Sequence, residues 1–190
     1  MIKAVIFDCF GVLVTDGWID FCHKYVDSDP EISQQAHDAV KRVDAGIDDY
    51  DWFFAELSRL SGQPAQAVRD HVQTNHLNQK LFDFIESYLK PDYKIGMLSN
   101  VGDNQLDRLF SQDHQKLFDE IVLSYQVGQV KPAPIMYETV ASKLGLTVEE
   151  CVFIDDQPRF CDGARQVGMK AIDYENPMQA IEDIKAHLNA

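Results

Sequence analysis

Side chains that could do chemistry follow four apolar runs of this sequence. In chain order they are Asp8 after residues 4–7, Ser99 and Asn100 after residues 94–98, Lys131 in the connection after residues 120–123, and Asp155 and Asp156 after residues 151–154. This combination of carboxylates, a hydroxyl and an ammonium group suits the transfer of a phosphoryl group. A carboxylate can attack phosphorus, and a Mg²⁺ ion bound by carboxylates cancels the repulsion between anionic reactants.

Each group can be given a role in such a transfer. Asp8 is the candidate nucleophile that would form an aspartyl phosphate, and Asp8 with Asp155 would bind Mg²⁺. Ser99 would donate a hydrogen bond to a phosphoryl oxygen, and Lys131 would supply positive charge. Taken singly, these residues fit turns, helix caps or a solvated surface. The pair of Asp155 and Asp156 is harder to explain that way, because adjacent carboxylates repel unless a cation or hydrogen bonds accept them.

The apolar runs predict the elements that bring these groups together. Five short runs rich in Val, Ile, Leu, Phe or Met are typical of buried parallel strands, at residues 4–7, 94–98, 120–123, 151–154 and 169–172. Stretches of helical character alternate with the later strands, at residues 103–110, 135–144, 160–167 and 178–188. The alternation predicts a doubly wound α/β sheet. Since ligands bind beyond the carboxyl ends of such strands, the polar side chains should converge there.

The long segment between the first two predicted strands indicates an insertion. Residues 8–93 are too many for one crossover helix, and their apolar residues recur at helical spacing, as in Trp52, Phe53, Leu57 and Leu60. We therefore predict an α-helical insertion over residues 15–81. The core domain would then consist of residues 1–14 and 82–190.

Charge and composition narrow the choice of partners. The chain has 17 Lys and Arg against 31 Asp and Glu, a net charge of −14, which disfavours nucleic acid and anionic membranes as partners. It shows no signal peptide, no apolar run of about 18 residues, and four cysteines without a CxxC pair. We expect a cytoplasmic protein that is monomeric by default, with a dimer left open.

The sequence resembles the haloacid dehalogenase-like (HAD) hydrolase superfamily over nearly its whole length. The four motifs occur in order, as FDCFGVLV with Asp8, GMLSN with Ser99, VKPAPIMYE with Lys131, and VFIDDQPRFCDGARQVGM with Asp155 and Asp156. The resemblance implies a Rossmann-like core with a helical cap inserted after the first motif. It also implies a Mg²⁺-dependent phosphatase or phosphotransferase that acts on a small phosphorylated metabolite through an aspartyl phosphate.

The resemblance further implies which of the site residues bind the phosphate and which bind the metal. Ser99, Asn100 and Lys131 would bind the phosphate. Asp8 and Asp155 would bind the metal, and Asp156 would be a further ligand or lie beside one. The family also takes a backbone carbonyl as a ligand from the position two residues after the nucleophile, which is Phe10 here.

Phe10 departs from the pattern of the phosphatases, which usually carry a second aspartate at that position. That carboxylate would protonate the leaving group and then activate water, help that is typically worth about 10² to 10⁴ in rate. We therefore expect slow turnover, above all with poor leaving groups. Asp16 and Asp162 are candidates for a substitute carboxylate, although a solvated turn is the plainer interpretation of Asp16. Phe160 is a second departure, because close members often carry asparagine there.

Phe10 also leaves two other functions open. An aromatic residue at this position resembles the metal-independent 2-haloacid dehalogenases of the same superfamily. The retained pair of Asp155 and Asp156, and the lack of any arginine between Val14 and Lys41, argue against that function. The other alternative is a catalytically weak or inactive protein that keeps the scaffold and binds a phosphorylated ligand or a partner.

Overall fold

Five parallel strands form the sheet that carries the predicted site residues. The computed structural model describes residues 1–189. The strand order is β3-β2-β1-β4-β5, and the bounds are β1 Ala4–Phe7, β2 Lys94–Ser99, β3 Glu120–Leu123, β4 Cys151–Asp155 and β5 Lys170–Asp173. All four residues of the central strand β1 are buried, as expected for a strand covered on both faces. The predicted strands and the doubly wound α/β fold are confirmed.

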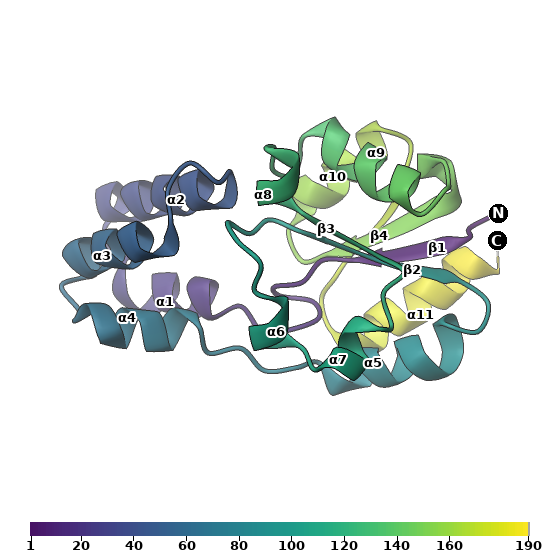
Figure 1. Cartoon of the computed structure of the whole chain (residues 1–190), viewed down its shortest axis with the longest axis horizontal. Coiled ribbons are helices and arrows are strands. Elements are labelled where there is room, and N and C mark those ends of the chain that lie inside the picture. Colours follow the sequence, from purple (N-terminus) through teal and green to yellow (C-terminus); the bar gives the residue numbers. More distant parts are fainter. Residues whose placement is uncertain (190) are drawn as a thin grey trace.

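Helices cover both faces of this sheet (Figure 1). Val5 and Phe7 belong to a hydrophobic cluster with α5 Gln79–Phe84, the π-helical turn η1 Ile85–Leu89 and α11 Pro177–Leu188. Ala4 and Ile6 point to the opposite face and pack with α9 Pro134–Lys143 and α10 Pro158–Gln166. Successive residues of a strand face opposite sides, so the apolar run of β1 joins the two layers. The short elements are α6 Leu106–Leu109, α7 Gln112–Gln115, α8 Ser124–Val127 and the 3-10 turn η2 Val148–Glu150.

The helix predicted over residues 103–110 is confined to the single turn α6. The Asn104 side chain accepts a hydrogen bond from the Leu106 backbone N–H at 3.1 Å, so the turn begins only there. Phe110 has an extended backbone and is buried in the cluster of α5 and α11. The remaining predicted helices correspond to α9, α10 and α11.

The first four helices after β1 bury a hydrophobic cluster of their own. They are α1 Gly17–Tyr25, α2 Pro30–Asp44, α3 Tyr50–Ser61 and α4 Ala65–Val72. The first three begin where an aspartate side chain accepts backbone N–H groups of the first turn, at Asp16, Asp29 and Asp49. Phe21, Leu57 and other apolar residues form the cluster. We call these four helices the insertion.

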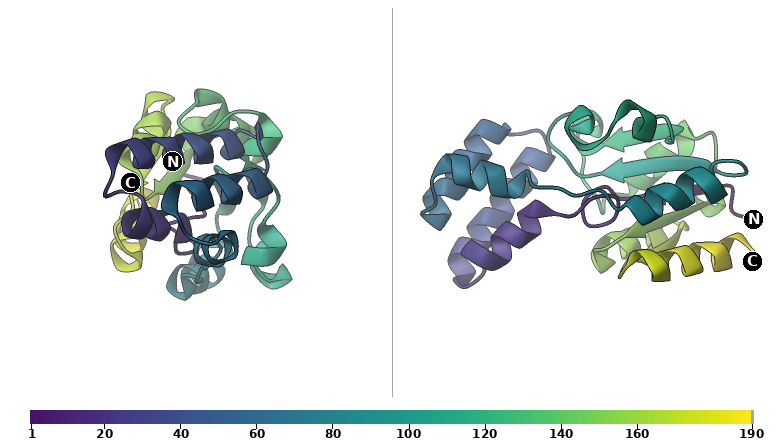
Figure 2. Two further views of the ribbon diagram at one scale, coloured as in Figure 1. Left: turned by 90° about the vertical axis from the view of Figure 1, so that its left-hand side faces the viewer. Right: turned by 90° about the horizontal axis from the view of Figure 1, so that it is seen from below.

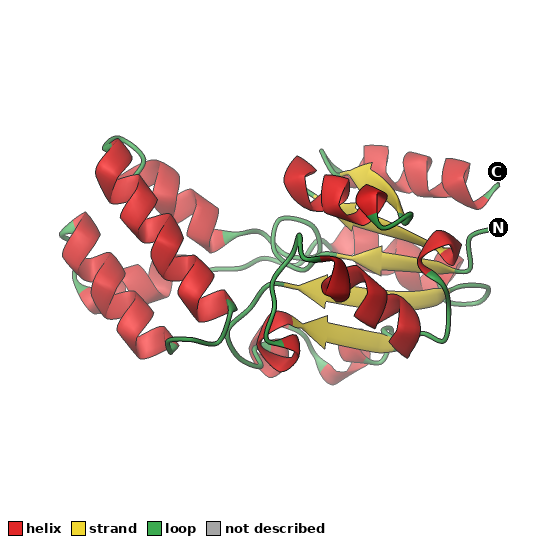
Figure 3. Ribbon diagram, turned by 90° about the horizontal axis from the view of Figure 1, so that it is seen from above, coloured by secondary structure: helices red, strands yellow, loops and turns green. Residues whose placement is uncertain are grey.

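The insertion stands in front of the carboxyl ends of the strands. The strand arrows in Figure 3 point toward it, and the left view of Figure 2 shows its helices in front of the core. Its two connections to the core run side by side, since Val14 and Leu77 form an antiparallel bridge and Asn78 N donates to Leu13 O at 2.9 Å. The chain returns to the core in α5, which starts at Gln79, just before the predicted boundary at residue 82.

The four cysteines are packing residues of the protein interior. Cys9, Cys22, Cys151 and Cys161 are all unpaired and buried, as expected for packing residues. No helix within residues 1–189 combines the length and the apolar character that a bilayer-spanning segment needs.

Because the insertion has a hydrophobic cluster of its own, its stability should depend on the leucines buried in that cluster. Leu57 is completely buried, so Leu57→Ala should lower the free energy of unfolding by about 2–5 kcal/mol. Ile47→Ala is the matched control, since Ile47 is exposed, and should change it by less than about 0.5 kcal/mol. Urea unfolding followed by circular dichroism measures both, and equal losses would contradict the packing described.

Candidate active site

A buried lysine joins two aspartates at the carboxyl ends of β1 and β4. Lys131 Nζ lies 2.8 Å from Asp8 Oδ1 and 2.6 Å from Asp155 Oδ2. All three side chains are buried. Burial opposes the charge of Lys131, but the Asp155 and Asp8 carboxylates outweigh it and raise its pKa. The ammonium group therefore stays charged inside the protein.

Backbone groups fix the members of this triad. Asp8 N donates to Ile154 O at 2.9 Å, and Asp8 Oδ1 accepts the Cys9 N–H at 2.7 Å. Asp155 is the last residue of β4, and its Oδ1 accepts the Gln157 N–H at 2.8 Å. Both carboxylates are therefore held in orientation by the peptide units that follow the strands.

Asn100 positions Lys131 rather than pointing freely into the site. Its Oδ1 accepts the Lys131 backbone N–H at 2.8 Å, and its Nδ2 donates to Lys131 O at 3.3 Å. The aromatic rings of Phe153 and Phe160 lie 5.2 Å and 4.9 Å from Lys131 Nζ, within the range of cation–π attraction. Arg159 stacks on Phe160 as well, 4.5 Å from its centroid. Phe160 thus packs between two cations.

Asp8, Asp155 and Asp156 form a group that could hold a metal ion. One carboxylate oxygen from each lies within 4.8 Å of the others. Asp156 Oδ1 is buried and has no hydrogen-bond partner among residues 1–189. Burial, and then Asp155, raise the pKa of Asp156 to about 6. Burial and Asp155 also raise the pKa of Asp8, against the opposing effect of Lys131. A divalent cation would relieve this repulsion, so the residues fit one.

Gly11 makes room for the Asp156 carboxylate. Its φ is +88°, and a Cβ atom there would lie 2.5 Å from Asp156 Cγ. The glycine after Phe10 is therefore required both by its backbone conformation and by the neighbouring carboxylate.

Ser99 is a further unsatisfied group beside the triad. It ends β2 and is buried, and within the described part of the chain its Oγ finds no hydrogen-bond partner. A buried hydroxyl without a partner is costly, so it is suited to bind an oxygen that arrives with a ligand.

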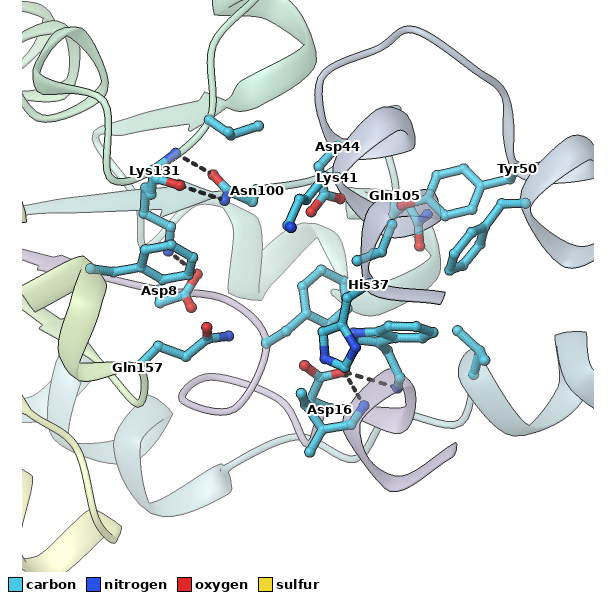
Figure 4. Close-up of a pocket in the computed structure, with 18 of the residues that line it drawn as sticks. Asp8, Asp16, His37, Lys41, Asp44, Tyr50, Asn100, Gln105, Lys131 and Gln157 are labelled. Carbon is cyan, nitrogen blue, oxygen red and sulfur yellow. Dashed lines mark hydrogen bonds and ion pairs between the residues drawn. The ribbon is translucent and has the colours of Figure 1, made fainter. Parts of the chain in front are cut away.

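A cavity of about 530 Å³ opens above these residues, between the core and the insertion. Figure 4 shows Asp8, Lys131, Asn100 and Gln157 on one side of it. The insertion and the residues that flank its helices contribute aromatic, aliphatic and polar side chains, which are Asp16, Trp18, Ile19, Gln34, His37, Val40, Lys41, Asp44, Tyr50, Phe53, Phe54, Val72 and Gln73. The volume is that of a site for a small organic ligand.

A family model for haloacid dehalogenase-like hydrolases matches residues 2–168. The chain belongs to this family. Within the HAD-like hydrolases, D-ribitol-5-phosphate phosphatase of Bacteroides thetaiotaomicron is 23% identical over the full length of both chains. A phosphatase of Mycobacterium tuberculosis is 38% identical over 55 residues, which are 29% of this chain and only 25% of that protein.

Solved structures share the HAD-like fold. A HAD family enzyme of Bacteroides thetaiotaomicron, in complex with magnesium and inorganic phosphate, has a TM-score of 0.72 at 19% identity, covering 92% of this chain and 95% of that one. A predicted HAD-like hydrolase of Porphyromonas gingivalis has a TM-score of 0.71 at 26% identity, covering 97% and 98%. The L-2-haloacid dehalogenase of Xanthobacter autotrophicus has a TM-score of 0.65 at 21% identity, covering 90% and 76%. Phosphatases and dehalogenases of this family therefore cannot be separated by fold.

The two candidates for a substitute carboxylate lie in different environments. Asp16 is not a solvated turn residue: it lines the cavity, and its Oδ1 caps α1 by accepting the Trp18 N–H at 2.9 Å. Asp162 is an exposed residue of α10 and pairs with Arg165 at 2.9 Å. Phe10 lines the cavity and packs against the core, and offers no side-chain proton.

Asp44, at the end of α2, is a third carboxylate in the cavity and was not predicted from the sequence. The cations Arg108 and Arg159 line the same cavity and were not predicted either. Asp44 and Arg108 belong to no motif and reach the cavity only through the packing of the insertion against the core. Arg159 lies within the fourth motif, and its position near the Asp155–Asp156 pair was the one signal available.

The buried triad should make stability depend on pH when its cation is removed. Lys131→Met leaves two carboxylates buried without their partner and should lower the free energy of unfolding by about 3–5 kcal/mol at pH 7. Their pKa values would rise further in the folded state, so protons bind the folded state more tightly and the loss should shrink as the pH falls from 7 to 5.

Urea unfolding at both pH values measures this effect. Lys116→Met is the control, because Lys116 and its partner Asp113 are exposed, and it should change the free energy of unfolding by less than about 1 kcal/mol. A deficit for Lys131→Met that is the same at pH 7 and pH 5 would contradict the electrostatic origin.

Proposed function

We propose that this chain is a Mg²⁺-dependent phosphatase or phosphotransferase that acts on a small phosphorylated metabolite through an aspartyl phosphate on Asp8. The observation that carries the proposal is the buried Asp8–Lys131–Asp155 triad, flanked by two buried polar atoms, Ser99 Oγ and Asp156 Oδ1, that have no hydrogen-bond partner among residues 1–189. One such atom is a donor suited to a phosphoryl oxygen and the other an acceptor suited to a cation.

Magnesium would be bound by Asp8 and Asp155, with Asp156 as a further ligand or neighbour and the Phe10 backbone carbonyl as the predicted fourth contribution. Three carboxylates this close carry more negative charge than Lys131 alone compensates. Bound there, Mg²⁺ would neutralise charge on the phosphoryl group and on its attacking carboxylate. The crystallised HAD enzyme with magnesium and phosphate supports this assignment.

Ser99 and Lys131 would receive the phosphoryl oxygens. The Ser99 hydroxyl is free to donate, and Lys131 brings a fixed positive charge into an otherwise acidic protein. Asn100 would act mainly by fixing the Lys131 backbone, through the two hydrogen bonds it makes there. Its direct contact with phosphate stays a prediction.

The reaction would proceed in two displacements. Asp8 attacks phosphorus, forming a carboxylate O–P bond as the bond to the leaving-group oxygen breaks. Water or another acceptor hydroxyl then attacks the same phosphorus and returns the electron pair to the Asp8 carboxylate. Lys131 holds Asp8 in place throughout and stabilises charge on the transferred group.

The insertion would act as the cap that recognises the rest of the substrate. It supplies about half of the residues that line the cavity and stands over the carboxyl ends of the strands, where it can exclude water. Full-length similarity to a phosphatase named for D-ribitol 5-phosphate supports a small organic phosphate as the substrate. A cytoplasmic location and a monomeric state remain predictions.

The nucleophile can be tested directly. With Mg²⁺ and p-nitrophenyl phosphate, Asp8→Asn should lose turnover by about 10³-fold or more, because no aspartyl phosphate can form. Wild-type protein quenched in acid during turnover should carry one phosphoryl group on the peptide that contains Asp8, detected by mass spectrometry. Equal residual activity in the two proteins would instead favour an inactive protein that only binds phosphorylated ligands.

The metal site can be tested at Gly11. Gly11→Ala should weaken Mg²⁺ binding, measured by isothermal titration calorimetry, because its Cβ displaces the Asp156 carboxylate. Gly128→Ala is a matched control: its φ is +72°, but apart from its chain neighbours no described residue places an atom within 4 Å of the added Cβ. It should cost about 1 kcal/mol of stability and leave Mg²⁺ affinity unchanged. Equal Mg²⁺ affinities of both variants would remove Asp156 from the metal site.

A metal-independent 2-haloacid dehalogenase is the second candidate, and Phe10 is the residue that favours it. The retained carboxylates of Asp155 and Asp156 speak against it, because a halide-releasing site needs no cation. Chloride release from a 2-chloroacid in the presence of chelator would establish this function in place of the phosphatase.

A further inference from the structure

The two displacements proposed above require a group that moves a proton. The leaving oxygen needs a proton as it departs, and the attacking water must lose one. Phe10 can do neither. Besides the nucleophile Asp8, the side chains that line the cavity and can in principle both donate and accept a proton include Asp16, His37 and Asp44.

Two of these three groups are occupied by local structure. Asp16 Oδ1 accepts the N–H groups of Trp18 at 2.9 Å and Ile19 at 3.3 Å, which form the first turn of α1. His37 Nδ1 lies 2.8 Å from Ser33 O, one turn earlier in α2, and its ring packs edge-on against Trp18. Protonation of Asp16 would weaken the helix cap, and movement of His37 would disturb packing.

Asp44 differs from Asp16 and His37. A hydrogen bond to the core holds its backbone, while its carboxylate is not used in local structure. Ser124, which follows β3 directly, donates its hydroxyl to Asp44 O at 2.6 Å. The preceding residue, Val43, approaches the core so closely that a Cβ atom on Gly102 would lie 2.4 Å from Val43 O. The Asp44 carboxylate accepts no hydrogen bond from residues 1–189 and lies across the pocket from Asp8 in Figure 4.

The electrostatic surroundings suit a group that both gives and takes a proton. Burial, followed by the nearby charge of Asp16, raises the pKa of Asp44 to about 7, while Lys131 and Arg159 on the core side oppose the shift. Lys41 and Tyr50 line the cavity on the insertion side. A pKa near the working pH is the best compromise for an acid that later serves as a base.

We propose that Asp44 is the general acid and general base of this enzyme, acting from the insertion in place of a carboxylate at position 10. The proposal rests on the phosphatase function proposed above. In the first displacement, the protonated Asp44 carboxyl gives its proton to the leaving oxygen as the P–O bond breaks. In the second, the Asp44 carboxylate takes a proton from water as the water oxygen bonds to phosphorus. The Asp8–P bond then breaks, and both carboxyl groups return to their starting states.

Asp44→Asn tests the proposal by stopped-flow kinetics with Mg²⁺. p-Nitrophenolate departs without a proton, so this variant should release a burst of one equivalent per site at close to the wild-type rate. Steady turnover should then be about 10² to 10⁴ slower, because aspartyl phosphate accumulates without a base. With phenyl phosphate, whose leaving group needs a proton, the first step itself should slow by a similar factor.

The comparison variants separate this role from a structural one. Asp70→Asn removes an exposed carboxylate of α4 and should behave as wild type. Asp16→Asn keeps a capping side chain and removes the rival acid. The proposal is overturned if Asp16→Asn shows the burst and Asp44→Asn does not, if Asp44→Asn slows both substrates equally without a burst, or if wild type already behaves like Asp44→Asn.

Failure of the phosphatase function gives a different result. Wild type with no turnover beyond that of Asp8→Asn, and no phosphoryl group trapped on Asp8, would overturn that function and the role of Asp44 with it. Wild type with Asp8-dependent turnover, and an Asp44→Asn variant indistinguishable from it on both substrates, would overturn the role of Asp44 alone.

Discussion

The contact on which the site depends is the buried ammonium group of Lys131 between Asp8 and Asp155. Three charged groups out of water are costly, and their attraction compensates only when the geometry is held closely. The fold provides that geometry through rigid elements: Asp8 and Asp155 end or follow neighbouring strands of the sheet, and Asn100 fixes the backbone of Lys131. Even so, three carboxylates against one lysine leave excess negative charge, which is why the pocket is suited to a cation as well as to an anion.

Much of the core could be predicted from the sequence because each strand is indicated by the composition of a few consecutive residues. An apolar run such as Ala4–Phe7 is buried on both faces of the sheet, so its composition alone indicates a central strand. The polar residues at strand ends followed from the rule that parallel strands present their carboxyl ends together. The helix predicted over residues 103–110 was too long because one side chain, Asn104, competes locally for the backbone N–H of Leu106.

The insertion side of the pocket could not be predicted in this way. Asp44 ends a helix whose sequence resembles that of any solvated amphipathic helix, and its place in the pocket depends on contacts with Ser124 and Gly102, far away along the chain. Asp16 was considered because it is near the first motif, but its use as a helix cap depends on where α1 begins. A residue that reaches the pocket only because the insertion packs against the core cannot be recognised from the residues next to it in the sequence.

Placing the proton-transfer group on the insertion has a mechanical consequence. A carboxylate at position 10 would stay beside Asp8 whatever the insertion does, since it belongs to the same loop of the core. Asp44 reaches the pocket only while α2 rests on Ser124 and Gly102. In the proposed mechanism, leaving-group protonation and water activation would then both require this arrangement of the insertion against the core. Phe10 fills the position beside the nucleophile with an apolar ring, so in the proposed mechanism the core loop itself would offer no base to an aspartyl phosphate on Asp8. Hydrolysis would thereby depend on the contacts that hold the end of α2 against Ser124 and Gly102.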